Sequence, residues 1–310
     1  MKRIYDFSRT PAKRNYTVAD LRALKGSGRT LSMANPANND ELQACVEAGI
    51  DLFVVGADQM TDVRRIAPHH FTGAGSTWAQ FGSEDEIVAH AYETMRDGAD
   101  MYYTLRSFDV MERMAREGIP VQSHIGLIPT FSHHCGGLRA WGRTADEAMK
   151  IYETLKRMED AGVFAVEAEC IAEEVLAAVN EKTTIVTFSL GSGNAGDAIF
   201  SFVADICGEA SEEDTPPKHA YAFGNVGRLH RQIHEERVRC PRQVPRGSHG
   251  PEIPLRRNEC EHAYRRAGEV SGNARQMDAN APVRLRGWHN CLSRLPRLRS
   301  TTGSCREPCR

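Results

Sequence analysis

Short apolar runs alternate with amphipathic segments across residues 17–190, and this alternation limits the folds open to the chain. The run Asp-Leu-Phe-Val-Val-Gly at 51–56 is almost continuously apolar, as in strands of a parallel sheet covered on both faces. Strands are predicted at 30–34, 51–56, 99–105, 119–124, 163–170 and 183–190, and more weakly at 76–81. Helices are predicted at 17–25, 39–48, 84–96, 108–117, 144–161 and 171–180. This pattern favours an α/β fold of the (β/α)8 TIM-barrel type.

The stretch 119–144 is where we expect the functional site. It opens as an apolar strand, breaks at His124 into a loop rich in glycine and histidine, and ends where Thr144 and Glu147 have the spacing of a helix capping box. Ligands of parallel α/β proteins bind where strands end and loops begin, so His124 lies at the chemically useful end of its strand. A core histidine bonded to a backbone carbonyl is the alternative interpretation.

Glu167 and Glu169 are two residues apart in the predicted strand 163–170, so both point from the same face. Paired inward carboxylates repel each other, which raises the pKa of one and leaves either a base nearer neutrality or a pair able to chelate a cation. A buried structural hydrogen-bonding role is the alternative for Glu169. Cys135 and Cys170 are interpreted as small buried residues, because no adjacent base is expected to activate either thiol.

Charge divides the chain near Cys240. The formal net charge is −2, but residues 241–310 contain 14 Arg, 6 Asp or Glu and no Lys. That segment therefore carries +8 and the rest −10, and it shows no pattern of strands or amphipathic helices. We predict an N-terminal arm at 1–16, a barrel at 17–239 and an irregular Arg-rich tail at 240–310. The tail is either a disordered segment that binds an acidic partner or a segment read out of frame.

The composition as a whole points to a small-molecule protein of the cytoplasm. A net charge of −2 gives no reason to expect nucleic acid or a membrane as a partner. The first ten residues are charged and lack the apolar run of a signal peptide, and no apolar stretch approaches the length of a membrane span.

Several motifs occur in a fixed order along the chain. They are Ala-Gly-Ile-Asp-Leu-Phe-Val-Val-Gly at 48–56, Ile-Pro-Val-Gln-Ser-His-Ile-Gly-Leu-Ile-Pro at 119–129, Glu-Cys at 169–170, Gly-Ser-Gly at 191–193 and Pro-Lys-His at 217–219. Together they resemble the ketopantoate hydroxymethyltransferase family, also called 3-methyl-2-oxobutanoate hydroxymethyltransferases. The resemblance extends over about residues 17–239. It implies a barrel similar to those of the phosphoenolpyruvate mutase/isocitrate lyase superfamily.

The resemblance also implies a reaction. Members of this family transfer a hydroxymethyl group from 5,10-methylenetetrahydrofolate to 3-methyl-2-oxobutanoate, a 2-oxo acid, which gives ketopantoate (2-dehydropantoate) for pantothenate biosynthesis. A proton next to a ketone is a weak acid, so a divalent ion such as Mg²⁺ stabilises the enolate while a carboxylate takes the proton. A homo-oligomer is implied as well.

Carrying the family's catalytic and metal-binding positions over residue by residue assigns two carboxylates. Glu169 aligns with the general base. Asp58 follows Val-Gly one position later than the family's first metal aspartate, so Asp58 is a predicted metal ligand. Glu167 is the second predicted ligand, because of its pairing with Glu169 on one strand face and not because of the resemblance. Gln80 stands nearest to the family's second metal aspartate.

Two positions that bind the substrate carboxylate and support the metal in the family carry different residues in this chain. Tyr103 and Leu105 stand where the family has a Lys and a Glu, while His124 is retained. The predicted substrate contacts are therefore His124, Asp58 and Tyr103. Two other hypotheses stay open: another metal-dependent 2-oxo acid lyase or mutase of the same superfamily, and a catalytically silent barrel that binds a small molecule.

Overall fold

The computed structural model describes residues 1–77, 79–209, 217 and 219–244. Residues 1–238 form one compact unit, and a second unit begins at Arg239. Of the predicted tail at 240–310, only residues 240–244 are described; the rest lies outside the described residues.

Parallel strands close into a barrel in the order β10-β3-β4-β5-β6-β7-β8-β9, which confirms the predicted fold class. Register is continuous around the ring, from Ala198 opposite Leu31 in the β10–β3 pair to Ala198 opposite Phe188 in the β10–β9 pair. The strands are β3 (Leu31–Asn35), β4 (Leu52–Gly56), β5 (Phe71–Gly75), β6 (Met101–Tyr103), β7 (Val121–Gly126), β8 (Ala165–Glu169), β9 (Val186–Leu190) and β10 (Ala198–Phe202).

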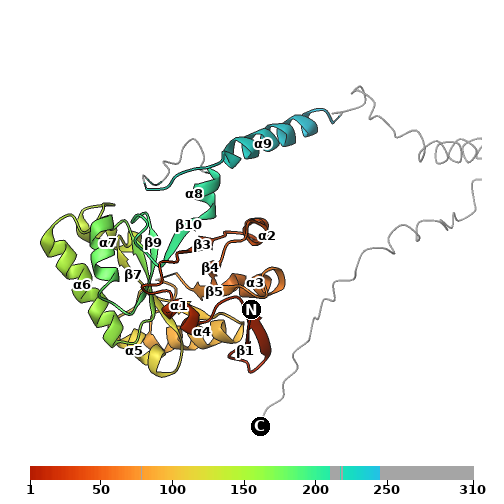
Figure 1. Cartoon of the computed structure of the whole chain (residues 1–310). Helices are drawn as coiled ribbons and strands as arrows, with labels where there is room; N and C mark the ends of the chain where they lie inside the picture. Colours follow the sequence, from red (N-terminus) through yellow and green to blue (C-terminus); the bar gives the residue numbers. More distant parts are fainter. Residues whose placement is uncertain (78, 210–216, 218, 245–310) are drawn as a thin grey trace, which may run out of the picture. The chain divides into compact units, whose positions relative to one another are not determined.

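Helices connect the successive strands from β3 to β9, and Figure 1 shows these connecting helices around the outside of the barrel. Their N-caps follow the sequence: Ser83 and Thr144 each accept a hydrogen bond from a backbone N–H three residues later. The helices are α1 (Val18–Arg22), α2 (Asn39–Ala48), α3 (Met60–Ile66), α4 (Glu84–Arg96), α5 (Phe108–Arg116), α6 (Ala145–Asp160), α7 (Glu173–Asn180), α8 (Val203–Cys207) and α9 (Val226–Arg242). Two 3-10 helices, η1 (Ala57–Gln59) and η2 (Pro129–Cys135), follow β4 and β7.

The prediction of a strand at 76–81 is wrong, because the third barrel strand is β5, Phe-Thr-Gly-Ala-Gly. At two of its five positions β5 has glycine in place of the β-branched and aromatic residues typical of a strand, but the packing of the neighbouring strand favours glycine at both positions. A Cβ on Gly73 would lie 2.4 Å from the end of the Met101 side chain, and one on Gly75 would lie 2.5 Å from the Tyr103 carbonyl oxygen. The neighbouring strand β6 therefore occupies the space that side chains of β5 would need.

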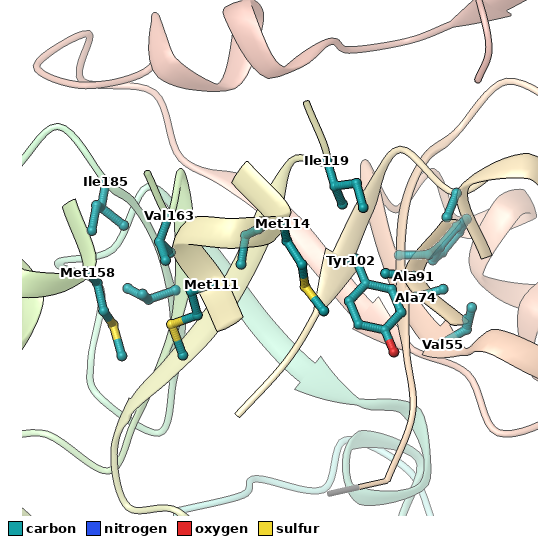
Figure 2. Close-up of a cluster of buried hydrophobic side chains, with 14 of the residues drawn as sticks. Val55, Ala74, Ala91, Tyr102, Met111, Met114, Ile119, Met158, Val163 and Ile185 are labelled. Carbon is teal, nitrogen blue, oxygen red and sulfur yellow. The ribbon is translucent and has the colours of Figure 1, made fainter. Parts of the chain in front are cut away.

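The apolar residues form two buried clusters. One fills the barrel interior, where Leu21 and Leu24, from α1 and just after it, pack with the inward side chains of the strands. The other lies between the strands and the outer helices. Figure 2 shows part of it, with Met111 and Met114 of α5 between Tyr102 on one side and Met158 on the other. Within the described residues, no helix is both long and apolar enough to cross a bilayer.

The first sixteen residues begin with an antiparallel hairpin of β1 (Lys2–Tyr5) and β2 (Pro11–Arg14). Arg14 at its end is buried, and its Nε lies 2.8 Å from Asp100 Oδ1 just before β6. Arg64 of α3 pairs with the same carboxylate at 2.8 Å. This ion network joins the hairpin to the amino ends of the strands, since Asp100 also accepts a hydrogen bond from the Thr72 N–H of β5.

Candidate active site

All five residues predicted for the site line one cavity of about 750 Å³. Tyr103 ends β6, His124 lies in β7, and Glu167 and Glu169 lie in β8. Asp58 belongs to η1, directly after β4. The side chains thus gather toward the carboxyl ends of the parallel strands, where (β/α)8 barrels hold their ligands.

The register of β7 and β8 brings an imidazole between two carboxylates. His124 is opposite Glu167, and Gly126 is opposite Glu169. His124 Nδ1 lies 3.8 Å from Glu167 Oε2, and Nε2 lies 3.3 Å from Glu169 Oε2. The second contact is close but not aligned as a hydrogen bond, and Nε2 has no hydrogen-bond partner among the described residues. All three side chains are at least nine-tenths buried.

Gly126 makes this close approach possible. Its φ is 88°, a left-handed value that favours glycine, and a Cβ there would lie 2.2 Å from the Glu169 carbonyl oxygen. The same stretch of backbone is tied to β8 by the Leu127 N–H, which donates to the Glu169 carbonyl at 2.8 Å. A side chain at position 126 would push the ends of β7 and β8 apart.

Tyr103 holds the other side of the imidazole. Its hydroxyl lies 3.0 Å from His124 Nδ1. Burial raises the pKa of Tyr103 well above its ordinary value, and the charges of Glu167 and Glu169 raise it further. The hydroxyl therefore stays protonated at neutral pH, and its oxygen can accept a hydrogen bond from the Nδ1–H of a protonated His124.

The two carboxylates change the ionisation of the cluster. Burial works against a charged imidazole, but Glu167 and Glu169 together outweigh it and raise the pKa of His124. Burial raises the pKa of Glu167, the charge of Glu169 adds to this, and His124 opposes it. The direction expected for one of the paired carboxylates is thus found at Glu167, but its main cause is burial and not repulsion by Glu169.

Asp58 lies apart from this cluster on the cavity wall. Its side chain is exposed, and its Oδ1 lies 2.5 Å from the place where a Cβ on Gly56 would be. Among the described residues, the ligand atoms that come within 4.8 Å of one another in this cavity are those of His124, Glu167 and Glu169. The metal role of Asp58 stays a prediction.

The cavity is acidic. Asp58, Glu93, Asp97, Glu167 and Glu169 line it, and no Lys or Arg is among the described residues that do so. Among the described residues of the cavity wall, the side chains that can carry a positive charge are those of histidines. Of these carboxylates, Glu167 and Glu169 are buried, and buried charge without a partner is costly, so this lining suits a cation.

Sequence reasoning missed the contribution of α4. His90, Glu93, Thr94 and Asp97 line the same cavity from this helix and its end. His90 Nδ1 lies 2.8 Å from the hydroxyl of the buried Tyr102. The signal was present in the sequence, because polar residues spaced three and four apart share one face of a helix.

A second cluster was also missed. Cys170 Sγ lies 3.2 Å from His219 Nδ1, so the interpretation that no base lies next to this thiol is wrong. The sequence could not show this, since 49 residues separate the two side chains. Burial raises the pKa of Cys170 to about 11, and the charge of Glu169 adds to this. The thiol is therefore protonated near neutral pH and is a poor nucleophile despite the neighbouring imidazole.

A closed parallel barrel with buried acidic and imidazole groups at the carboxyl ends of its strands has the arrangement of (β/α)8 barrels that act on small molecules. The comparison with protein families agrees with this class. A family model described as ketopantoate hydroxymethyltransferase matches residues 59–236. The chain belongs to this family.

Curated relatives carry the name 3-methyl-2-oxobutanoate hydroxymethyltransferase. The protein from Anaeromyxobacter dehalogenans (strain 2CP-1 / ATCC BAA-258) is 28% identical over 251 residues, which cover 71% of this chain and 81% of that protein. The protein from Pseudoalteromonas translucida (strain TAC 125) is 32% identical over 141 residues, or 44% and 53% of the two chains. A solved structure of 2,3-dimethylmalate lyase, a PEP mutase/isocitrate lyase superfamily member, aligns with a TM-score of 0.47 and 12% identity, over 83% of this chain and 98% of that one.

Proposed function

We propose that the chain transfers a hydroxymethyl group from 5,10-methylenetetrahydrofolate to 3-methyl-2-oxobutanoate, giving ketopantoate in pantothenate biosynthesis, by metal-assisted enolisation. Family membership supports the reaction class. The observation that carries the proposal is the position of Glu169, a carboxylate at a strand end that faces an acidic cavity with an imidazole 3.3 Å away.

The lining of the cavity fits a divalent cation. It offers carboxylate oxygens, which Mg²⁺ prefers, and no Lys or Arg is among the described residues that line it. Glu167 and Asp58 are the residues that would hold the ion. When bound, it would supply the positive charge that the oxygens of a 2-oxo acid need in this cavity.

Glu169 takes the proton from the carbon next to the keto group. The pKa of His124 is raised, so its imidazole favours the positively charged form, 3.3 Å from the Glu169 carboxylate. Tyr103 fixes the ring of His124 from the opposite side through the 3.0 Å contact of its hydroxyl with Nδ1. Asp58 and Tyr103 also border the space in which the substrate would lie.

Solvent deuterium exchange tests this proposal before any one-carbon donor is added. The full chain is incubated in D₂O with 3-methyl-2-oxobutanoate, with and without Mg²⁺, and loss of the C3 proton signal is followed by NMR. Exchange that depends on Mg²⁺ is expected, and addition of the folate donor should then give ketopantoate. A folded protein that gives no exchange with Mg²⁺ contradicts the proposal.

A specific observation favours a second candidate, another metal-dependent 2-oxo acid lyase or mutase. Tyr103 and Leu105 line the cavity where the family that this sequence resembles has a Lys and a Glu. No Lys or Arg is among the described residues of the lining, so none can bind the carboxylate of a substrate there. Exchange with a different 2-oxo acid, without turnover of the folate donor, would favour this candidate.

The cellular setting belongs to the same proposal. A cytoplasmic homo-oligomer accords with pantothenate biosynthesis and with the family resemblance. Light scattering of the purified full chain gives its mass in solution, and a monomer at working concentrations would contradict the assembly part.

A further inference from the structure

We propose that Cys170, His219 and Glu169 form a site for a thiophilic divalent cation such as Zn²⁺. One ligand atom from each residue lies within 4.8 Å of the other two. All three residues also line a cavity of about 680 Å³. Glu169 borders this cavity and the larger one, so the proposed site lies on the other side of the same carboxylate.

The spacing of the ligand atoms is close to that of a zinc site. Zn–S and Zn–N bonds of about 2.3 and 2.0–2.1 Å at a tetrahedral angle place the sulfur and nitrogen roughly 3.5 Å apart. In the structure Cys170 Sγ and His219 Nδ1 are 3.2 Å apart, so a shift of a few tenths of an ångström is enough. Their hydrogen bond holds the two ligands together without an ion.

Both ligands are held in place by surrounding backbone. Cys170 has a φ of 51°, a left-handed conformation uncommon for a residue with a side chain. It is fixed there by its N–H, which donates to the Leu190 carbonyl, and by its carbonyl, which accepts from the Trp141 N–H. Such strain persists where the surroundings determine the conformation, and it clusters at functional sites.

The His219 side chain packs directly on the backbone of Gly191. A Cβ at Gly191 would lie 2.6 Å from the imidazole ring, so the glycine creates the space that the ring fills. The ring is thereby directed toward Cys170, on the same side of the barrel as the loop after β9. The ligand set is thus built from the end of β8 and a segment far along the chain.

The donor set distinguishes this site from the acidic cavity. A thiolate and an imidazole bind Zn²⁺ or Co²⁺ far better than Mg²⁺, which prefers oxygen ligands. Coordination by zinc deprotonates a thiol, so the protonated state of free Cys170 is no obstacle. Three protein ligands leave a fourth position for water or a small anion from the cavity.

Occupation of this site has a consequence that rests on the proposed function. A carboxylate that binds a cation is a weaker base, so Glu169 would accept a proton from the substrate less readily while it holds the ion. Zn²⁺ bound by Cys170, His219 and Glu169 therefore makes Glu169 unavailable as the general base and inhibits Mg²⁺-supported proton exchange. The site would make the barrel sensitive to thiophilic metal ions.

Cobalt substitution tests the site without reference to activity. The full chain, kept reduced by a phosphine and free of metal, is titrated with Co²⁺ while the near-ultraviolet absorption is recorded. Thiolate ligation gives a sulfur-to-cobalt charge-transfer band, which carboxylate and imidazole ligands alone do not give. We expect this band in the wild-type protein and its loss in Cys170→Ser, whereas the matched variant Cys135→Ser retains it.

Two further variants distinguish the loss of a metal ligand from a failure of the Cys170→Ser chain to fold. Cys170→Gly removes the thiol and suits the left-handed backbone, so it should fold and lack the band. His219→Phe keeps a ring over Gly191 and removes the nitrogen, and it should weaken Co²⁺ binding by at least the roughly tenfold loss seen when outer-shell partners are removed. Absence of the band in wild type, or an unchanged band in Cys170→Ser and Cys170→Gly, overturns the proposal.

The inhibition is measured separately, as the ratio of deuterium exchange with and without Zn²⁺ at constant Mg²⁺. The ratio should fall well below one in wild type and lie closer to one in His219→Phe, each protein being compared with its own Zn²⁺-free rate. Equal ratios contradict the inhibitory role. If wild type gives no exchange with Mg²⁺ alone, the proposed function fails, while the charge-transfer band still decides the metal site.

Discussion

Replacement of Glu169 by Gln is the most informative single change in the cavity. The substitution keeps the shape of the side chain at the end of β8 and removes its ability to accept a proton. A positioned general base contributes about 10²- to 10⁴-fold to a rate, or roughly 3–5 kcal/mol of barrier. We therefore expect Glu169→Gln to lower the Mg²⁺-supported exchange rate of 3-methyl-2-oxobutanoate by about that factor and to leave its binding largely intact.

The same substitution has a second readout in His124. Glu169 is one of the two carboxylates that raise the pKa of this imidazole, so its removal should lower that pKa. NMR titration of the His124 ring in the wild-type and variant chains measures the change. A lower pKa would show that the two side chains still contact each other in solution as they do in the structure.

The assay compares three proteins by NMR in D₂O: wild type, Glu169→Gln and the control Glu174→Gln. Glu174 is exposed on α7 and lies outside both cavities, so its substitution should not alter exchange. Binding of the 2-oxo acid is measured in parallel by calorimetry. An exchange rate in Glu169→Gln equal to that of wild type would remove Glu169 from the mechanism.

Three further predictions concern stability, measured by urea unfolding followed by circular dichroism. Gly126→Ala should destabilise the chain by about 1–3 kcal/mol or more, because its Cβ would clash with a backbone oxygen at a left-handed φ; no loss would mean that the strand ends are not so close. Leu155→Ala should cost about 2–5 kcal/mol, since Leu155 of α6 is fully buried, and a cost below about 1 kcal/mol would contradict that burial. Burial opposes ionisation of Glu159, but contacts with Lys156 and Thr184 outweigh it and lower its pKa to about 2. The lowered pKa gives stability that is present above the unfolded pKa of about 4.3 and lost as pH falls toward 2, so Glu159→Gln should flatten the pH dependence in that window, and an unchanged slope would refute the assignment.

The barrel could be predicted because its strongest signals are local. Strands β8 and β9 are buried along their whole length, and β4 is buried up to Val55, as strands covered on both faces must be. The segment 56–82 could not be read in the same way. It contains η1, α3 and β5, and the glycines of β5 are explained by the side chains and backbone of β6, which follows about 25 to 30 residues later.

The sequence could predict those site residues whose location depends only on their position along a strand. Glu167 and Glu169 share a face by their spacing, and His124 lies near the end of its strand, so their meeting in one cavity follows from parallel strands. Their distances depend on the register of β7 against β8, which no local pattern states. The contact of Cys170 with His219 depends on chain closure over 49 residues and was invisible for the same reason.

The charge of the larger cavity connects the metal, the substrate and the altered residues. A 2-oxo acid is an anion, and two like charges 4 Å apart repel by about 4 kcal/mol at an effective dielectric constant of 20. Glu167 and Glu169 would oppose its entry, and the imidazolium of His124 offsets at most one of them. Where the resembling family has a lysine, this cavity has the neutral hydroxyl of Tyr103. If the proposed function holds, we therefore expect substrate binding in this chain to depend on a bound cation more strongly than it would in a barrel that kept the lysine.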